Sequence, residues 1–214
     1  MTQLSAIVFA VRRTLAAQGI SVSTGHAQQL ASAALGHNNL ASYQASNDDG
    51  RLALASVIAF DFERLSERAT HLGLDGTSFS QALFGALKER FPATHIYPNQ
   101  EDWLAAVQNH FELEIINDGR IESEVAMTNG TFPRIDIELP WWETLDEDDG
   151  DVLSTEVEGL VTVDQDDDRA YFGHDIDVRA TLTVERYGRR LFGEYHLEVE
   201  KASLRWLGEP NPSF

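Results

Sequence analysis

The most restrictive pattern in this sequence lies near its end, where apolar and polar residues alternate on both sides of Tyr187-Gly188. Every second residue from Ile176 to Val184 is apolar, and apolar or small residues again recur at every second position from Leu191 to Val199. A period of two is typical of a strand with one buried face. Two such runs separated by a short link predict an antiparallel hairpin. We place its turn at Tyr187-Gly188.

Two further hairpin signals precede this one, Asp118-Gly119 and Asn129-Gly130. Such dipeptides favour the tight turns that join antiparallel strands. The strands predicted around them and after them cover residues 111–117, 120–128, 132–139 and 153–163. Because every link in this half is short, we expect an antiparallel meander of five or six strands.

The first half of the chain follows the helical period instead. Thr2 is a suitable N-cap and Gly19 a suitable stop for a first helix. The apolar residues of that helix are Leu4, Ile7, Val8, Val11 and Leu15. Further helices are predicted after Ser23 or Thr24, after Asn38 or Asn39, and over residues 51–71, 77–91 and 99–110. The fold class is therefore α+β, with a helical half followed by an antiparallel sheet.

We divide the chain into three parts on this basis. Residues 1–47 form a small helical module, residues 48–110 add further helices, and residues 111–214 form an acidic antiparallel β domain. The charge changes with the first boundary. Residues 1–47 contain two arginines and no acid, whereas the rest of the chain holds all 35 acids and 14 basic residues. The net charges are therefore +2 and −21.

Fourteen of these acids lie between Arg134 and Arg169, with no basic residue among them. Such a field repels nucleic acid and accelerates encounter with basic partners, although acidic surfaces also serve solubility. Trp141 and Trp142 precede the densest acidic segment, and an exposed indole there would anchor a partner. The residues predicted to bind a basic protein are Trp141, Trp142, Asp146, Glu147, Asp148, Asp149, Asp151, Asp164, Asp166, Asp167, Asp168, Asp175, Asp177 and Glu198.

A turn at Tyr187-Gly188 would place like charges opposite each other across the last hairpin. Asp177 would face Glu198, and Asp175 would face Glu200. Directly opposed like charges destabilise a sheet. Two explanations for these opposed acids stay open. Either the basic residues Arg179, Lys201 and Arg205 neutralise this column of acids locally, or the sheet keeps a negative face for a basic partner.

The segment HAQQLASAALGHNNLASYQAS, residues 26–46, reads as a helix, a glycine-containing turn and a second short helix. It resembles the helix-turn-helix of repressor-like domains, which implies DNA binding. A DNA reader needs basic residues to contact phosphates, and this segment has neither lysine nor arginine. We therefore favour a packing or docking module and keep a DNA-binding regulator with an acidic sensor domain as an alternative.

The acidic cluster from Asp164 to Asp177 raises a second alternative, a calcium-binding or hydrolytic protein. Alternate carboxylates at residues 164, 166 and 168 suit calcium, and Asp175 occupies the twelfth position of such a loop. However, Arg169 stands where a calcium-binding loop of the EF-hand type requires glycine. His110, Glu112 and Glu114 alternate at a predicted strand start, which would place them on one face as ligands. We expect no metal and no cofactor.

Sequence motifs typical of phosphate-binding loops, hydrolases, metalloproteases and dinucleotide-binding enzymes are absent. The chain has no cysteine, and its first apolar run is too short to span a bilayer. The sequence therefore predicts a cytoplasmic protein of bacterial character that is not an enzyme and not a membrane protein. We expect it to dock on a positively charged protein site, as an immunity protein, an antitoxin or a nucleic-acid mimic would.

Overall fold

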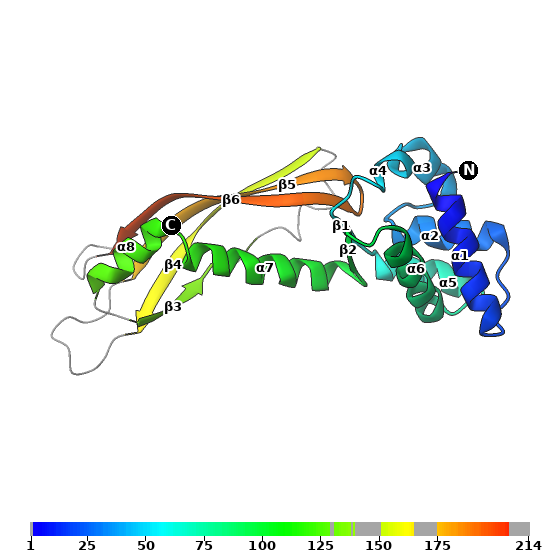
Figure 1. Ribbon diagram of the computed structural model, residues 1–214, viewed down its shortest axis with the longest axis horizontal. Helices are drawn as coiled ribbons and strands as arrows, with labels where there is room; N and C mark the ends of the chain where they lie inside the picture. Colours follow the sequence, from blue (N-terminus) through cyan, green and yellow to red (C-terminus); the bar gives the residue numbers. More distant parts are fainter. Residues whose placement is uncertain (1, 129–130, 138, 140–150, 165–174, 206–214) are drawn as a thin grey trace. The chain divides into compact units, whose positions relative to one another are not determined.

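The computed structural model describes residues 2–128, 131–137, 139, 151–164 and 175–205. The helices are α1 (Gln3–Ala17), α2 (Thr24–Ala34), α3 (Leu40–Ala45), α4 (Asp48–Arg51), α5 (Phe62–His71), α6 (Gly76–Arg90), α7 (Gln100–Ile116) and α8 (Gly119–Thr128). The strands are β1 (Val57–Ala59), β2 (His95–Tyr97), β3 (Thr131–Asp136), β4 (Val152–Asp164), β5 (Ile176–Gly188) and β6 (Leu191–Leu204). The α+β class is confirmed, with the helices concentrated in the first half of the chain (Figure 1).

The strands form one mixed sheet in the order β2-β1-β6-β5-β4-β3. β1 pairs with β2 in parallel and with β6 in antiparallel fashion, and β3 pairs with β4 in antiparallel fashion. The chain divides into two compact units. The first comprises Met1–Leu104, Asp149–Val152 and Val184–Glu194, and the second comprises Ala105–Asp148, Leu153–Thr183 and Tyr195–Phe214.

The first unit is built around four helices. α1 packs against α2 and α6, and α5 packs against the same two helices. The predicted apolar stripe of α1 is fully buried, and Thr2 caps this helix by accepting a hydrogen bond from the Ser5 N–H. Leu191 of β6 belongs to the same buried core, so the last hairpin completes this unit.

Asp49 of α4 adds a second cap to α1 from a distant part of the sequence. Its carboxylate accepts hydrogen bonds from the backbone N–H groups of Gln3 and Leu4, at 3.0 and 2.8 Å. Tyr43 also donates to Asp49, at 3.3 Å. Burial and the nearby Asp49 carboxylate raise the pKa of Tyr43 far above its usual value, so its hydroxyl keeps its proton. Three donors therefore share one carboxylate.

In the second unit, one face of β4 and β5 is buried and α7 runs along the strands (Figure 1). Every second residue of β5 from Ile176 to Leu182 is buried, as the alternation predicts. Phe111 and Ile115 of α7 are fully buried as well. Gln108 of α7 donates a hydrogen bond to the Ile137 carbonyl at 2.8 Å, which links this helix to the chain beyond β3.

The prediction of strands over 111–117 and 120–128 is wrong. Both segments are helical, because α7 continues to Ile116 and α8 follows it. Asp118 does not begin a hairpin; its side chain accepts a hydrogen bond from the Arg120 N–H at 2.9 Å and so caps α8. The predicted turn at 129–130 lies outside the described residues.

The helix predicted over 51–71 is also wrong in its first part. This segment contains the last residue of α4, the three-residue strand β1 and then α5. Asp61 caps α5 by accepting a hydrogen bond from the Arg64 N–H. The turn of the last hairpin lies at Arg189-Arg190 rather than at Tyr187-Gly188, because β5 continues to Gly188 and β6 begins at Leu191. Within the described residues, no helix is both long enough and apolar enough to cross a membrane.

Candidate functional site

The exposed face of β4, β5 and β6 in the second unit carries most of the described acidic side chains of these strands. On β4, Glu156, Glu158 and Asp164 are exposed and alternate with buried apolar residues. On β5, Asp177 is half-buried, and on β6 Glu198 and Glu200 are exposed. We call these six residues the acidic sheet face.

Two arginines neutralise part of this face. Arg179 of β5 bonds to Glu158 through its Nε, 2.6 Å from the carboxylate Oε1. Arg205, directly after β6, pairs with the Asp177 carboxylate. Local neutralisation, one of the two explanations considered from the sequence, therefore occurs at both arginines. Glu156, Asp164 and Glu198 make no ion pair within the described residues.

The predicted column of opposed like charges is wrong, because it depended on the turn at Tyr187-Gly188. Asp175 is not bonded to its predicted neighbour Glu200: its carbonyl accepts a hydrogen bond from the Arg205 N–H at 2.7 Å. Glu200 accepts a hydrogen bond from the Thr181 hydroxyl at 2.6 Å. The observed register therefore brings Arg205 close to Asp175 and Asp177.

The other predicted partner-binding residues are placed as follows. Asp151 belongs to the first unit, and its highly exposed carboxylate lies 3.5 Å from an Arg51 Nη atom. Nine predicted residues lie outside the described residues: Trp141, Trp142, Asp146, Glu147, Asp148, Asp149, Asp166, Asp167 and Asp168. Of the predicted set, the structure therefore brings Asp164, Asp177 and Glu198 onto the acidic sheet face.

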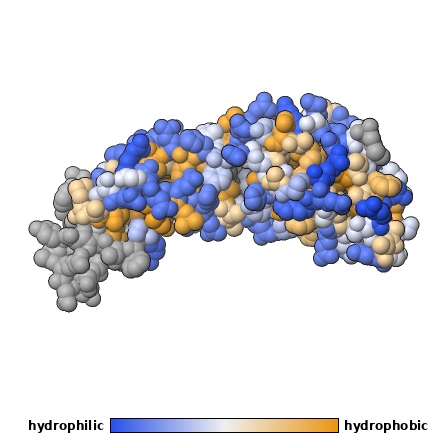
Figure 2. All heavy atoms as spheres, viewed as in Figure 1, coloured by the Kyte–Doolittle hydropathy of each residue, from blue (hydrophilic) through white to orange (hydrophobic). Residues whose placement is uncertain are grey.

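The second unit also contains a groove of about 630 Å³ between α7 and β6. We call it the α7–β6 groove; its lining residues are His110, Leu113, Glu114, Asn117, Asp118, Tyr195, His196, Leu197 and Val199. Along α7 and the strands beside it, hydrophobic side chains are interspersed with hydrophilic ones on the face shown in Figure 2. The groove therefore offers both apolar contact and carboxylates.

The predicted alternation of His110, Glu112 and Glu114 on one strand face is wrong, because these residues lie on a helix. A spacing of four residues places His110 and Glu114 on one side of α7. Their Nε2 and Oε1 atoms are 3.6 Å apart. Glu112 bonds to Gln108 instead. The three side chains therefore do not form one ligand set.

Tyr195 is the most unusual residue of the groove. Its ring meets the His110 ring edge-on, with centroids 5.0 Å apart and planes at 85°. Its hydroxyl oxygen is buried and has no hydrogen-bond partner in the part of the chain that the structure describes. A buried polar group without a partner costs about 1–3 kcal/mol.

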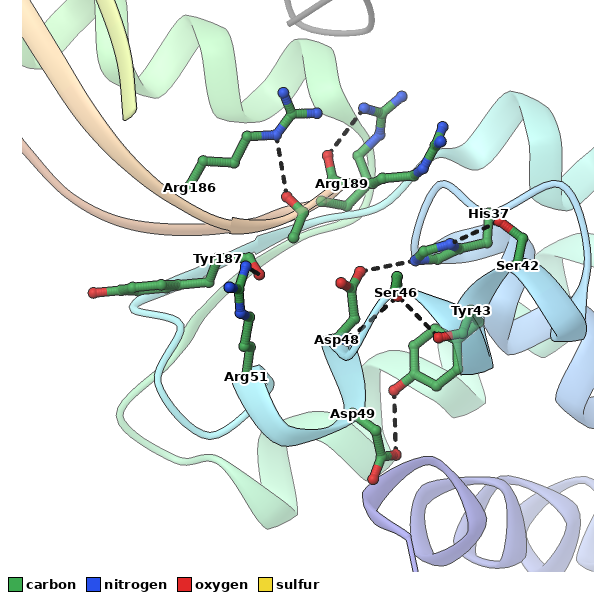
Figure 3. Close-up of polar contacts among 12 residues, drawn as sticks. His37, Ser42, Tyr43, Ser46, Asp48, Asp49, Arg51, Arg186, Tyr187 and Arg189 are labelled. Carbon is green, nitrogen blue, oxygen red and sulfur yellow. Dashed lines mark hydrogen bonds and ion pairs between the residues drawn. The ribbon is translucent and has the colours of Figure 1, made fainter. Parts of the chain in front are cut away.

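A different polar cluster in the first unit was not predicted from the sequence. The fully buried His37 lies 2.8 Å from an Asp48 carboxylate oxygen through Nε2 and 3.4 Å from the Ser42 hydroxyl through Nδ1 (Figure 3). The order of groups is that of a nucleophile, a base and a carboxylate. However, the imidazole has no exposed surface and its contact with Ser42 is long. We therefore assign this cluster a structural role.

The segment that resembles a helix-turn-helix forms α2 and α3, with Asn39 capping α3. Its turn contacts basic residues that come from outside the segment. The Asn38 backbone carbonyl accepts a hydrogen bond from Arg68 of α5 at 2.6 Å, and the Asn38 side chain bonds to Arg64. Arg64 and Arg68 thus bind the protein itself, and DNA binding stays a prediction.

Comparison of this chain with protein-family models, with curated proteins and with solved structures finds no match.

Proposed function

We propose that this protein is a non-catalytic binding protein whose acidic sheet face docks on a positively charged site of another protein. The observation that carries the proposal is the charge of that face. It holds six carboxylates, and two of them, Glu158 and Asp177, are paired with arginines. The four others are Glu156, Asp164, Glu198 and Glu200.

Electrostatics explains why such a face would be useful. Carboxylates that share a surface repel each other, and that repulsion is relieved when a basic surface covers them. Exposed charges of this kind steer a partner into the correct orientation and raise the association rate more than they slow dissociation. Added salt screens the attraction over about 8–10 Å. The acids at 146–151 and 166–168 extend the same charge along the sequence.

An inhibitor, an immunity protein or an antitoxin acts in this way when it covers the basic site of a nuclease or another nucleic-acid enzyme. Nucleic-acid-binding sites are rich in lysine and arginine because these side chains contact phosphates. An acidic protein surface can occupy the same positions. We therefore propose a nucleic-acid-binding protein as the partner class.

The test uses a sheet-face variant in which Glu156, Glu198 and Glu200 are replaced by glutamine. A control variant carries Glu67→Gln, Glu89→Gln and Glu101→Gln, which change the net charge equally at exposed helical positions. Proteins captured from a lysate of the source cells are quantified on the immobilised wild type and both variants. Their association rates are then measured at low and high salt.

We expect basic nucleic-acid-binding proteins to be captured by the wild type and the control and to be lost from the sheet-face variant. The association rate should fall steeply with salt for the wild type. Equal capture by all three proteins, independent of salt, would exclude the proposal. A mobility shift of generic duplex DNA at low salt would instead favour the DNA-binding alternative.

A further inference from the structure

We propose that a basic pocket beside α5 binds the phosphate group of a small phosphorylated molecule. We call it the α5 pocket; it has a volume of about 470 Å³ and is lined by Asn38, Arg64, Glu67, Arg68, His71 and Leu72. All lining residues except leucine are polar or charged, which favours a strongly polar ligand. The pocket belongs to the first unit and the acidic sheet face to the second, so this inference does not depend on the proposed function.

Three basic side chains share one side of the helix. Arg64, Arg68 and His71 occupy positions i, i+4 and i+7 of α5. Like charges four residues apart repel each other and destabilise a helix slightly. Cations in the last turn also favour the helix dipole, which explains Arg68 and His71 but not Arg64 at the start of α5. A bound anion would relieve the repulsion between the two arginines.

Both guanidinium groups are held against the same residue, Asn38, in the turn between α2 and α3. Arg68 Nη2 donates to the Asn38 backbone carbonyl at 2.6 Å, and Arg64 Nη1 donates to the Asn38 side-chain oxygen. Asp61 accepts a further hydrogen bond from Arg64 Nε at 3.1 Å. These bonds place two long side chains side by side before a ligand arrives. Less side-chain entropy is therefore lost when an anion binds between them.

The two arginines keep donors for a ligand. A guanidinium carries five N–H groups. Within the described residues, Arg64 uses two of these groups and Arg68 uses one, which leaves three and four. His71 is exposed and adds a ring N–H. Phosphate oxygens accept paired N–H groups from guanidinium in a geometry that a lysine ammonium does not match.

The acids near the pocket do not cancel its charge. Glu67 lines the pocket, is exposed and forms no ion pair within the described residues. Asp61 is shared between Arg64 and Arg190, whose side chains both contact its Oδ2 atom. Three arginines, including Arg68, therefore stand against two carboxylates, a net charge of +1. In a chain of net charge −19, such a group gives an anion a local attraction.

The test is an NMR titration of the full chain with glycerol 3-phosphate at constant pH and ionic strength, with acetate as the control anion. We expect saturable shifts of the backbone signals of Asn38 and His71 and of the guanidinium signals of Arg64 and Arg68. Acetate should bind these groups much more weakly, because it carries one charge and two oxygens. The absence of saturable shifts, or equal affinity for acetate, would overturn the phosphate assignment.

Two variants of opposite effect locate the site. Arg68→Gln should weaken the binding of glycerol 3-phosphate by at least about tenfold. Arg13→Gln removes the same charge at an exposed position outside the pocket and should leave the affinity nearly unchanged. Glu67→Gln removes the opposing charge and should tighten binding severalfold. A gain of affinity cannot result from partial unfolding, so this variant decides the test if Arg68→Gln folds poorly.

The contrary results for these variants are equally definite. Unchanged or weaker binding in Glu67→Gln would overturn the inference. So would equal losses in Arg68→Gln and Arg13→Gln, because the effect would then be one of net charge alone. Arg68→Lys keeps the charge and loses the planar pair of donors, so it should bind more weakly than the wild type. Full affinity in this variant would overturn the guanidinium geometry.

A short duplex DNA distinguishes the two sources of phosphate. At concentrations at which glycerol 3-phosphate saturates the α5 pocket, we expect the duplex to leave the signals of Arg64 and Arg68 unshifted. Larger shifts of these signals with the duplex would overturn the assignment to a small molecule and favour the DNA-binding alternative. The sheet-face variant should bind glycerol 3-phosphate as the wild type does, because its three substitutions lie in the second unit.

Discussion

The backbone of Gly188 lies directly against the carboxylate of Asp48. A Cβ atom on this glycine would be 2.6 Å from Asp48 Oδ2, well inside van der Waals contact. The same oxygen atom is 2.8 Å from His37 Nε2. Asp48 is therefore held on one side by an imidazole and approached on the other by the end of β5 (Figure 3).

We expect Gly188→Ala to destabilise the protein by about 2 kcal/mol, because the added methyl group must displace a buried carboxylate from its hydrogen bond. The free energy of unfolding, measured with urea, checks this. Gly85→Ala is the matched control. Nothing lies within 4 Å of a Cβ at Gly85, which is in α6, so this variant should be more stable by about 0.5–1 kcal/mol. Equal stability of the two variants would refute the close contact.

Replacement of His37 by alanine should cost about 3 kcal/mol or more, because it leaves the buried Asp48 carboxylate without its imidazole hydrogen-bond partner. His71→Ala, at an exposed position, should change stability by less than about 0.5 kcal/mol. The double variant His37→Ala/Asp48→Ala should cost less than the two single changes together. Strict additivity in this cycle would show that the two side chains do not interact.

Asp75 should make the stability of α6 depend on acidic pH. The Ser78 hydroxyl, followed by the Thr77 and Ser78 backbone N–H groups, lowers the pKa of this carboxyl below its usual value. A lowered pKa means that the stabilisation is complete above about pH 4, the unfolded value, and is lost as pH falls through the folded value. The urea midpoints of the wild type and of Asp75→Ala should therefore converge once the pH is below the pKa of Asp75 in the folded protein. A difference that stays constant down to low pH would contradict the assignment.

Arg179→Gln should strengthen association with a basic partner. The variant frees the Glu158 carboxylate and adds one net negative charge to the acidic sheet face. Because both side chains are about half exposed, at 52% and 51%, their pairing contributes at most about 1 kcal/mol to stability. The association rate should rise severalfold at low salt and not at high salt. Arg13→Gln on α1 is the charge-matched control, and an equal rise in that variant would count against the sheet face.

The sequence predicted correctly the helices whose ends are marked by a capping residue or by a glycine stop. Thr2, Ser23 and Asn39 each accept a backbone hydrogen bond at the start of a helix. Gly19 follows α1 with a positive φ of 80°, as a glycine stop requires. Local chemistry decides such ends, so they can be recognised without knowledge of the fold.

Strands were wrongly predicted over residues 111–128 because the turn dipeptides were given more weight than the spacing of the apolar residues. Trp103, Val107, Phe111 and Ile115 are all buried and recur every four residues, which is a helical period. Asp-Gly favours a hairpin, but aspartate also caps helices, and Asp118 does so here. The spacing of the apolar residues was the stronger signal.

Other features depended on contacts that no local pattern reveals. β1 and β2 are three residues long and pair across 38 positions of sequence, as Val57 with His95. The α7–β6 groove combines two segments that are far apart in the sequence, residues 110–118 and 195–199, and the alternation around Tyr195 marked that residue only as part of a strand. His37 lies in the segment that resembles a helix-turn-helix, and that resemblance drew attention to the helices rather than to the buried imidazole and its partner Asp48.

The contribution of Val184–Glu194 to the first unit has a consequence for how the chain is made. Leu191, which lies in the core with Ile7 and Leu30, is synthesised long after the helices that carry these two residues. A ribosome that has released residues 1–104 therefore exposes a helical cluster that still lacks part of its apolar filling. Such a nascent chain should remain open to chaperones and proteases until the final hairpin emerges, and a truncated product that stops before residue 184 should be degraded rather than accumulate.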